Sequence, residues 1–440
     1  MKKTALLILL TLSVSLSAQT IYYVKPAGNN GWDGRENVYT NIQTAINAAA
    51  LSVADANVQV WIAQGTYTLT QPLEPQNRVD VIGGFSGNET NISERSFVGK
   101  GKNVTILDGD NKCQIIYQNN GLSYPVCWSN LIIENGNALG NGGGVWLNSN
   151  MTLKGCIIRD NIGQSAGGGA YLNGNACLIN CLVVRNLIKK EDPSLGGIGV
   201  YCKDESKVIN CTVADNSGST VRGISGLGIH ATDNAFIGNT IVWGNSTNYG
   251  YDGDAMQIYV KKNAEVSYCA IANGCDQGEN IINLSPINTG HPAVSFIDPK
   301  PGNNWNISES SVCIDAGNND LIAGEEFDLN GKKRILNGHY EANIATVDIG
   351  AFEFGEDDIN TESGKVSDVQ FYPNPCSGIL YQTTKSDNPC TVKIITLSGV
   401  VLYKGEVSSS SINLGSLPKG NYLLQWQTST ESGAMPLLLK

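Results

Sequence analysis

The chain has 440 residues, which is enough for two or three domains and a large core. Its 50 glycines and 7% aromatic residues are typical of a turn-rich all-β protein. The 29 basic and 40 acidic residues give a net charge of −11 at pH 7. This balance argues against a nucleic-acid partner, because nucleic-acid binding needs clustered Lys and Arg.

Residues 1–18 have the pattern of a secretory signal peptide. A basic start at Lys2 and Lys3 precedes an apolar run of about a dozen residues, and small residues follow it. The run is too short for a membrane span, and no later segment is apolar enough to be a transmembrane segment. We therefore expect an exported protein, in which the 12 cysteines are free to form disulfides.

The start of the mature chain predicts a capped solenoid end. Residues 41–50 form an amphipathic helical pattern, followed by strand-like runs at 58–67, 79–87 and 103–109. An open solenoid end exposes unpaired strand edges, so we expect the short helix to cover it. The apolar face of this helix is formed by Ile42, Ala45, Ile46 and Ala49.

The middle of the chain is a repeat. One position recurs in five copies at steps of 25, 30, 29 and 29 residues: Val145, Ala170, Val200, Ile229 and Ile258. Apolar positions alternate with polar ones, so the elements are strands. Short strands with one coil per copy predict a parallel β-helix, which the handedness of parallel crossovers makes right-handed.

Three columns of small or aliphatic residues are expected to face the core. The first contains Leu153, Leu178, Val208, Ile237 and Val266. The second contains Ile158, Val183, Val213, Val242 and Ile271. The third contains Cys156, Cys181, Cys211, Thr240 and Cys269, in which we expect cysteine to act as a small apolar residue.

Motifs at both ends of this region resemble those of secreted bacterial right-handed β-helix proteins of the pectin-lyase-like superfamily. The first motifs are YYVKPAG, WIAQGTY, IGGFSGNET and TILDGD, and the last are SVCIDAGNND, DLNGKKRI and VDIGAFEFG. The resemblance covers residues 20–355 and implies the β-helix fold. It implies little about activity, because the superfamily includes lyases, hydrolases and adhesins.

The C-terminal part has a different character. Residues 356–368 are polar without periodicity and predict a linker. In residues 369–440, alternating apolar residues bounded by Pro, Gly and Ser predict a small antiparallel β-sandwich. The motifs YPNP, LSG and LPKGNY and the terminal Lys440 resemble the type A C-terminal sorting domain of type IX secretion cargo.

This second resemblance implies where the protein is located. It implies that residues 369–440 bind the type IX secretion machinery, after passage through the periplasm of a Gram-negative bacterium, and are then removed. The mature protein would be secreted or attached to the cell surface. Cys376 and Cys390 depart from the family pattern and suggest a disulfide pair.

One column of the repeat is aromatic. The column contains Trp146, Tyr171, Tyr201, His230 and Tyr259. Its neighbours on both sides are inward apolar columns, so strand alternation points the rings outward. We expect a flat strip on which sugar rings stack, with Asn148, Asn173 and Lys203 at its edge. Alternatively, the rings stack on each other and contribute about 0.5–1.5 kcal/mol per pair to stability.

An amide column is expected to be structural. It contains Asn135, Asn161, Asn186, Asn216 and Asn245. Asn tolerates the left-handed conformation of a sharp bend, and stacked amides can hydrogen-bond along the solenoid axis.

The candidates for acid/base chemistry are charged residues. Glu134, Asp160, Arg185 and Asp215 form a column with Arg159 beside it. Lyases of the resembling superfamily combine calcium-binding carboxylates with a Lys or Arg base, which makes this row the catalytic candidate. The alternative is a neutralised surface ladder, which adds little stability. Near Arg334, we expect a salt-bridged closing cap rather than a metal site from Asp315, Asp328, Asp348 and Glu353.

These observations predict a secreted or cell-surface β-helix that binds extracellular polysaccharide or surface glycan through its outer face. No cofactor or metal is expected. The alternative function is that of a polysaccharide lyase or glycoside hydrolase, and only a lyase would need calcium.

Overall fold

The computed structural model describes residues 20–440 with internal gaps. The gaps are 54–56, 190–195, 219–225, 248–255, 285–294, 299–303, 323–325, 337, 339–344, 356–369, 373–375, 384–389, 397–400, 408–410 and 428–431. The predicted signal peptide (1–18) and linker (356–368) therefore lie outside the described residues. The chain divides into two compact units, Met1–Asp357 and Asp358–Lys440, which are described separately.

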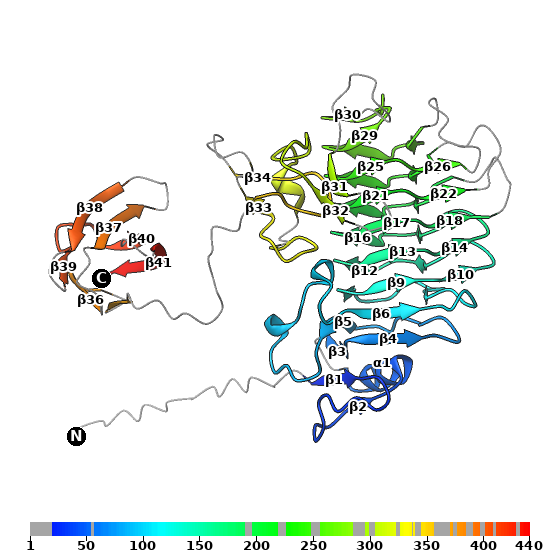
Figure 1. Ribbon diagram of the computed structural model, residues 1–440, viewed down its shortest axis with the longest axis horizontal. Coiled ribbons are helices and arrows are strands. Elements are labelled where there is room, and N and C mark those ends of the chain that lie inside the picture. Colours follow the sequence, from blue (N-terminus) through cyan, green and yellow to red (C-terminus); the bar gives the residue numbers. More distant parts are fainter. Residues whose placement is uncertain are drawn as a thin grey trace, which may run out of the picture. The chain divides into compact units, whose positions relative to one another are not determined.

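The first unit is a parallel β-helix, as predicted (Figure 1). One coil runs through four strands, namely β11 (Val145–Leu147), β12 (Met151–Lys154), β13 (Ile157–Arg159) and β14 (Ile162–Gly163). Each strand pairs in parallel with its counterpart 25 residues later in the next coil. The coils therefore build four sheets, here named A, B, C and D.

Sheets A and B are the longest. Sheet A comprises β2 (Val38–Tyr39), β1 (Ile21–Val24), β3 (Val58–Ala63), β5 (Val79–Phe85), β8 (Val126–Ser129), β12, β16 (Cys177–Ile179), β20 (Lys207–Ile209), β24 (Phe236–Gly238) and β28 (Glu265–Ser267). Sheet B comprises β30 (Ile282–Leu284), β29 (Ala270–Ala272), β25 (Ile241–Trp243), β21 (Thr212–Ala214), β17 (Leu182–Val184), β13, β9 (Ile132–Glu134), β6 (Thr105–Asp108) and β4 (Gly65–Thr68).

Sheets C and D complete the coils. Sheet C comprises β27 (Ile258–Val260), β23 (Ile229–Ala231), β19 (Val200–Cys202), β15 (Ala170–Leu172), β11 and β7 (Ile116–Tyr117). Sheet D comprises the two-residue strands β10 (Asn137–Ala138), β14, β18 (Leu187–Ile188), β22 (Ser217–Gly218) and β26 (Ser246–Thr247). Sheet D was not predicted from the sequence, because strands of two residues are too short to show alternation.

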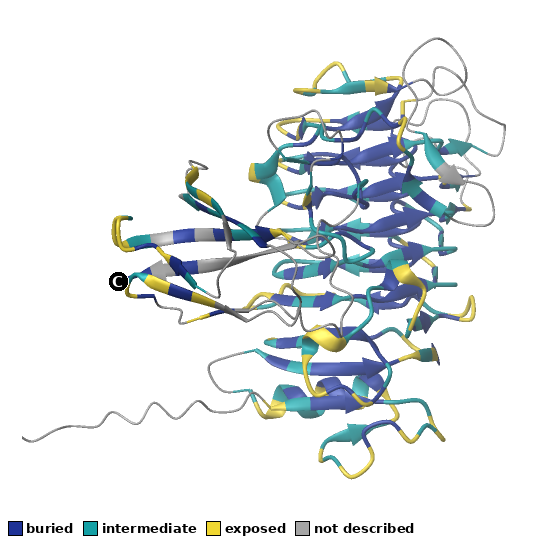
Figure 2. Ribbon diagram, turned by 60° about the vertical axis from the view of Figure 1, so that its left-hand side comes forward, coloured by how far each residue is buried: buried dark blue, intermediate teal, exposed yellow. Residues whose placement is uncertain are grey.

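The predicted core columns are confirmed. Leu153, Leu178 and Val208 pair in register, and so do Ile158, Val183 and Val213. Cys156, Cys181, Cys211 and Cys269 are fully buried in the same core. Figure 2 shows this buried interior along the coils. The cysteines therefore serve as small apolar core residues.

The predicted capping helix is also present. Helix α1 (Ile42–Leu51) packs against β1, β2 and β3 at the N-terminal end of the solenoid (Figure 1). The Asn41 side chain accepts a hydrogen bond from the Thr44 N–H and so satisfies one free amide of the first turn. Its buried face consists of the four predicted residues, Ile42, Ala45, Ile46 and Ala49.

The amide column forms a buried ladder between sheets B and D. Nδ2 of Asn161 donates to Oδ1 of Asn186, and the same bond links Asn186 to Asn216, each at 2.9 Å. The ladder continues through Asn245 to Gln257. All of these side chains are fully buried.

Two details of the predicted amide column are wrong. Gly136, not Asn135, occupies the ladder position in the first coil, where its N–H donates to Asn161 Oδ1 at 2.8 Å. The left-handed residues come one position earlier: Asn135, Asp160, Arg185, Asp215 and Gly244 have φ between 53° and 66°. The bend therefore uses the residue before the ladder, and the ladder amides themselves avoid positive φ.

The segment after the coils is a lateral cover and not an end cap, which corrects the prediction. Its elements are β31 (Phe296–Asp298), β32 (Asn304–Ile307), η3 (Asn319–Ile322), β33 (Ile335–Leu336) and β34 (Thr346–Val347). In Figure 1 it lies at the side of the solenoid. The Ala351 N–H donates to Thr212 Oγ1, and Trp305 packs in a cluster with Leu182 of sheet B. The outer face of sheet B is apolar and needs this cover.

The second unit is an antiparallel β-sandwich, as predicted. One sheet comprises β35 (Gln370–Tyr372), β36 (Ile379–Thr383) and β39 (Ser411–Asn413), and the other comprises β38 (Val401–Val407), β37 (Cys390–Thr396), β40 (Gly420–Gln427) and β41 (Ser432–Leu439). Residues from both sheets, among them Leu380 and Leu424, form one core. Cys376 and Cys390 are buried in this core as free thiols, so the suggested disulfide is not formed.

Candidate functional site

The aromatic column lies on the outer face of sheet C. Its residues pair in register across β11, β15, β19, β23 and β27. The neighbours Val145 and Leu147 are fully buried, whereas the Trp146 ring between them is only half-buried. Tyr117 of β7 pairs with Trp146 and extends the row by one ring that the sequence analysis missed. We call the six residues the aromatic ladder: Tyr117, Trp146, Tyr171, Tyr201, His230 and Tyr259.

The rings of the aromatic ladder stand against one another and do not lie flat. From Tyr117 to Tyr259, successive ring centroids are 5.4, 5.2, 5.1, 4.6 and 5.1 Å apart. The Tyr171 and Tyr201 planes differ by 6° and are stacked. Coils are about 4.8 Å apart, which is too close for rings lying side by side in one plane. The expected flat strip is therefore absent, and the rings pack against one another in stacked, tilted and edge-to-face pairs.

A row of polar side chains runs beside the aromatic ladder, in the turns that lead from sheet C to sheet A. Asn173 Nδ2 donates to Asn148 Oδ1 at 3.2 Å, and Asn148 Nδ2 donates to the Asn119 carbonyl at the same distance. In the next coil Lys203 Nζ lies 3.8 Å from Asp204 Oδ2. We call these residues, together with Asp233 and Lys262 of the following coils, the turn row.

The phenol groups of the aromatic ladder lie close to the charges of the turn row. Burial, with smaller contributions from the nearby Tyr201, Asp204 and Asp233, raises the pKa of Tyr171 to about 12. Burial is also the main cause of a raised pKa for Tyr201, to which Asp233 adds. Both hydroxyls are therefore protonated hydrogen-bond donors at neutral pH. His230 is the most enclosed ring, with 6% exposure.

The charged candidates form an ion-pair row at the corner after sheet B. Arg159 Nη2 lies 2.6 Å from Glu134 Oε2, and Arg185 binds Asp160 with both Nε and Nη2, at 2.8 and 2.6 Å. Burial raises the pKa of Asp215, and the Arg185 charge opposes this shift. The strand register aligns Glu134 with Arg159, whereas the prediction placed Glu134 in the Asp160 column. Both arginines are held by carboxylates, which favours charge neutralisation over a role as base.

The acidic cluster of the lateral cover surrounds a buried arginine. Arg334 Nη1 lies 3.0 Å from Glu353 Oε1, and neither side chain is exposed. Asp348 accepts the N–H groups of Asp315 and Phe354 at 2.7 and 2.6 Å. Burial raises the pKa of Asp348 to about 6. This is the predicted salt-bridged cluster, but it holds the cover together along the side of the solenoid.

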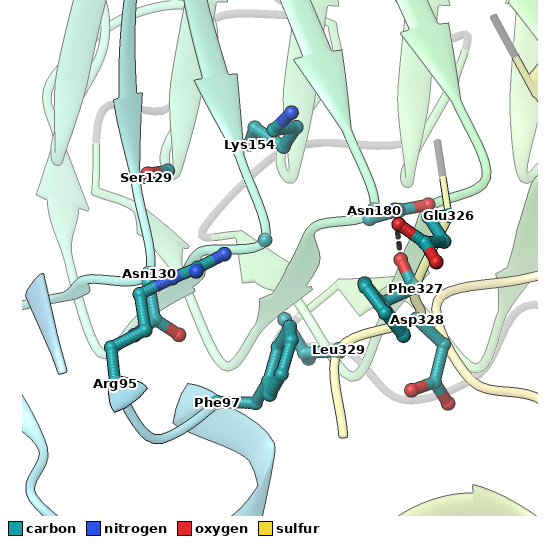
Figure 3. A pocket seen from close by; sticks show the side chains of 11 residues that line it. Arg95, Phe97, Ser129, Asn130, Lys154, Asn180, Glu326, Phe327, Asp328 and Leu329 are labelled. Carbon is teal, nitrogen blue, oxygen red and sulfur yellow. Dashed lines mark hydrogen bonds between the residues drawn. The ribbon is translucent and has the colours of Figure 1, made fainter. Parts of the chain in front are cut away.

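A pocket of about 340 Å³ lies where this cover meets the corner between sheets A and B (Figure 3). Three segments that are distant in the sequence line it. They are the loop around 95–97, the coil corners at 129–130, 154–155 and 180, and the cover at 326–329. Figure 3 shows Arg95 and Asn180 on opposite sides of the space. This pocket was not predicted from the sequence, because its lining residues do not belong to a single motif.

Among the described residues, no group of His, Cys, Asp and Glu has an arrangement that would hold a metal ion. The part of the chain that the structure describes also has no helix with the length and apolar character of a membrane span.

Comparison with known proteins identifies the C-terminal unit. Residues 370–438 match the family of the secretion system C-terminal sorting domain. No curated protein matches the chain. The protein is therefore a secreted parallel β-helix protein with a type IX sorting domain at its C-terminus.

Solved structures that are similar to this chain share little sequence identity with it. Pectin methylesterase from Aspergillus niger, in its deglycosylated form, shares 14% identity, with coverage of 62% of this chain and 89% of that chain and a TM-score of 0.30. Tailspike protein 2 from Escherichia coli O157:H7 bacteriophage CAB120 shares 10% identity, with coverage of 88% and 58% and a TM-score of 0.27. Scores this low carry no inference about function.

Proposed function

We propose that this protein binds an extracellular polysaccharide or surface glycan through the aromatic ladder and the turn row. One observation carries the proposal. Half-buried aromatic rings and protonated phenols lie beside a continuous row of amide, carboxylate and amine groups. Sugars combine apolar C–H surface with many hydroxyl groups, and this surface offers partners for both.

The repetition of the surface favours a repeating ligand. Each coil adds one ring and one polar turn, at intervals of about 4.8 Å. A polymer that runs along the solenoid axis would meet similar groups at every coil. Several weak contacts on one ligand raise the overall affinity, because each later contact forms within a complex. An extended glycan chain therefore fits better than a compact ligand.

The route to the cell surface is part of the proposal. Residues 1–18 would direct the chain into the periplasm of a Gram-negative bacterium, and residues 369–440 would bind the type IX secretion machinery. The family match of residues 370–438 supports the second step. We expect the mature surface protein to lack residues 369–440. Intact-mass measurement of surface material tests this, and a mass that still includes Lys440 contradicts it.

Glycan binding is tested with the purified full chain on a glycan array. Tyr171→Phe keeps the stacked ring but removes the hydroxyl, and Asn173→Ala removes a polar group of the turn row. Each should weaken binding by about 0.5–1.5 kcal/mol, the net contribution of one hydrogen bond. Tyr124→Phe is the control, because Tyr124 is exposed and lies outside the ladder.

Two outcomes would contradict glycan binding at this surface. One is an array without a bound glycan, and the other is unchanged affinity in the Tyr171→Phe and Asn173→Ala double variant. Release of unsaturated or reducing ends from a bound polysaccharide would instead support the lyase or hydrolase alternative.

A further inference from the structure

The pocket at the edge of the lateral cover has the size of a small-molecule site. Its volume of about 340 Å³ lies near the lower end of the range of about 300–1,000 Å³ that is usual for such sites. Its walls come from the loop between η1 (Ile92–Glu94) and η2 (Val98–Lys100), the coil corners and the cover. The aromatic ladder contributes no residue to it.

Arg95 supplies an unsatisfied donor on one side of the pocket. Its Nη1 donates to the Ile92 carbonyl at 2.9 Å, and the guanidinium lies 5.2 Å from the Phe97 ring centroid. Its Nε is buried without a hydrogen-bond partner, and no described carboxylate forms an ion pair with this residue. A half-buried guanidinium charge without a carboxylate beside it costs free energy, which an anion bound next to the guanidinium would recover.

The other cation on the pocket wall is in a different situation. Lys154 lies on the outer face of sheet A, where its charge acts on Asp80. The half-buried Asp80 carboxylate also accepts the Cys127 N–H at 2.7 Å. The negative charge near Lys154 is thus provided by the protein, whereas Arg95 has no such carboxylate. An anion in the pocket is therefore expected at Arg95.

The opposite side of the pocket offers acceptors. Asn180 Nδ2 donates to the Phe327 carbonyl at 2.8 Å, which orients the amide and leaves its buried Oδ1 without a partner. The exposed Glu326 carboxylate lies beside it (Figure 3). Asp328 does not compete with the anion for Arg95, because its oxygens accept the N–H groups of Asn330, Lys332 and Glu353.

We propose that this pocket binds a hexose-sized ligand with one anionic group. The anionic group lies at Arg95, and hydroxyl groups on the other side of the ligand donate to Asn180 Oδ1 and Glu326. The shared chemistry of the anionic group is that of a carboxylate or a phosphate. The proposal does not depend on glycan binding at the aromatic ladder, since the two sites share no residue.

Isothermal titration of the full chain with three hexoses tests the proposal. Glucuronate, glucose 6-phosphate and glucose share one sugar ring and differ in carrying a carboxylate, a phosphate or no anion. At least one anionic hexose should bind, at least about tenfold more tightly than glucose. The better of the two identifies the anionic group. If neither binds, the proposal is wrong.

Variants assign the binding to the pocket. Arg95→Gln should weaken binding of the anionic hexose about tenfold or more, because it removes a charged donor. The control Arg78→Gln removes an arginine outside the pocket and should leave binding unchanged. Glu326→Ala, at an exposed position, keeps the fold and removes the acceptor, so it should weaken binding severalfold even if Arg95→Gln folds poorly. Unchanged affinity in both pocket variants would overturn the proposal.

Discussion

Two ladders of side chains run along the same coils of the solenoid. One is buried and the other is partly exposed, so they can serve different roles. In the amide ladder, Asn161 to Gln257, every step is a hydrogen bond inside the wall, and no side chain reaches solvent. In the aromatic ladder, neighbouring rings pack against each other in stacked, tilted or edge-to-face pairs, while all of the rings except His230 remain half-buried. The buried amide ladder can only hold the coils together, whereas the aromatic ladder on the outer face of sheet C can also contact a ligand.

Substitutions in the amide ladder should reduce the free energy of unfolding more than substitutions in the aromatic ladder. Asn186→Ala removes the side chain that bonds Asn161, Asn216 and the Ile158 carbonyl. Several buried polar groups lose their partner at once, each at about 1–3 kcal/mol. We expect a loss of about 3 kcal/mol or more of unfolding free energy in a denaturant titration. Asn263→Ala, at an exposed turn, is the control and should cost less than about 0.5 kcal/mol. A loss below about 1 kcal/mol for Asn186→Ala would contradict the comparison.

Substitutions in the aromatic ladder should cause a smaller loss of stability. Tyr171→Ala removes two ring contacts, with Trp146 and Tyr201, and each contributes about 0.5–1.5 kcal/mol. We therefore expect a loss of about 1–3 kcal/mol, measured by the same titration. Leu153→Ala, which opens a core cavity, should cost about 2–5 kcal/mol. Tyr171→Phe keeps both ring contacts and should leave stability nearly unchanged. If the Phe variant were as unstable as the Ala variant, the hydroxyl would be the structural group.

Unlike the two ladders of asparagine and aromatic side chains, the lateral cover contains buried carboxyl groups that titrate near neutral pH. The pKa of Asp348 is raised by burial to about 6, above the ordinary value of about 3.9. The folded state therefore binds the proton more tightly, so stability falls as pH rises through 6. Lowering the pH from 8 to 5 should add about 1.4 kcal/mol through this group.

Thermal melting across this pH range tests the prediction, with Asp348→Asn as the comparison. The variant lacks the titrating group, so its stability should depend less on pH. Asp328 and Glu353 also have a pKa raised by burial, and they act in the same direction. An unchanged pH slope in Asp348→Asn would assign the effect to these neighbours. The amide ladder has no titratable group and contributes nothing to this slope.

Local patterns determined much of this molecule. Alternation along each copy placed the core columns, because side chains of a strand point to opposite faces whatever surrounds them. The spacing of Ile42, Ala45, Ile46 and Ala49 determined the buried face of α1 for the same kind of reason. A further signal was present and overlooked. Sheet B strands such as Leu182–Val184 are apolar at every position, which indicates burial on both faces and hence a cover.

Other features were decided only by the tertiary structure. The register of the first coil is set by the hydrogen bond from the Gly136 N–H to Asn161 Oδ1. Alignment of the repeats in the sequence placed Asn135 at this ladder position instead. Whether the rings lie flat or pack against each other depends on the distance between coils, which no single copy of the repeat contains. The pocket joins Arg95, Asn180 and Glu326 from segments far apart in the chain. Periodicity reports what each residue does within its own strand, whereas ring packing and pockets depend on groups that only folding brings together.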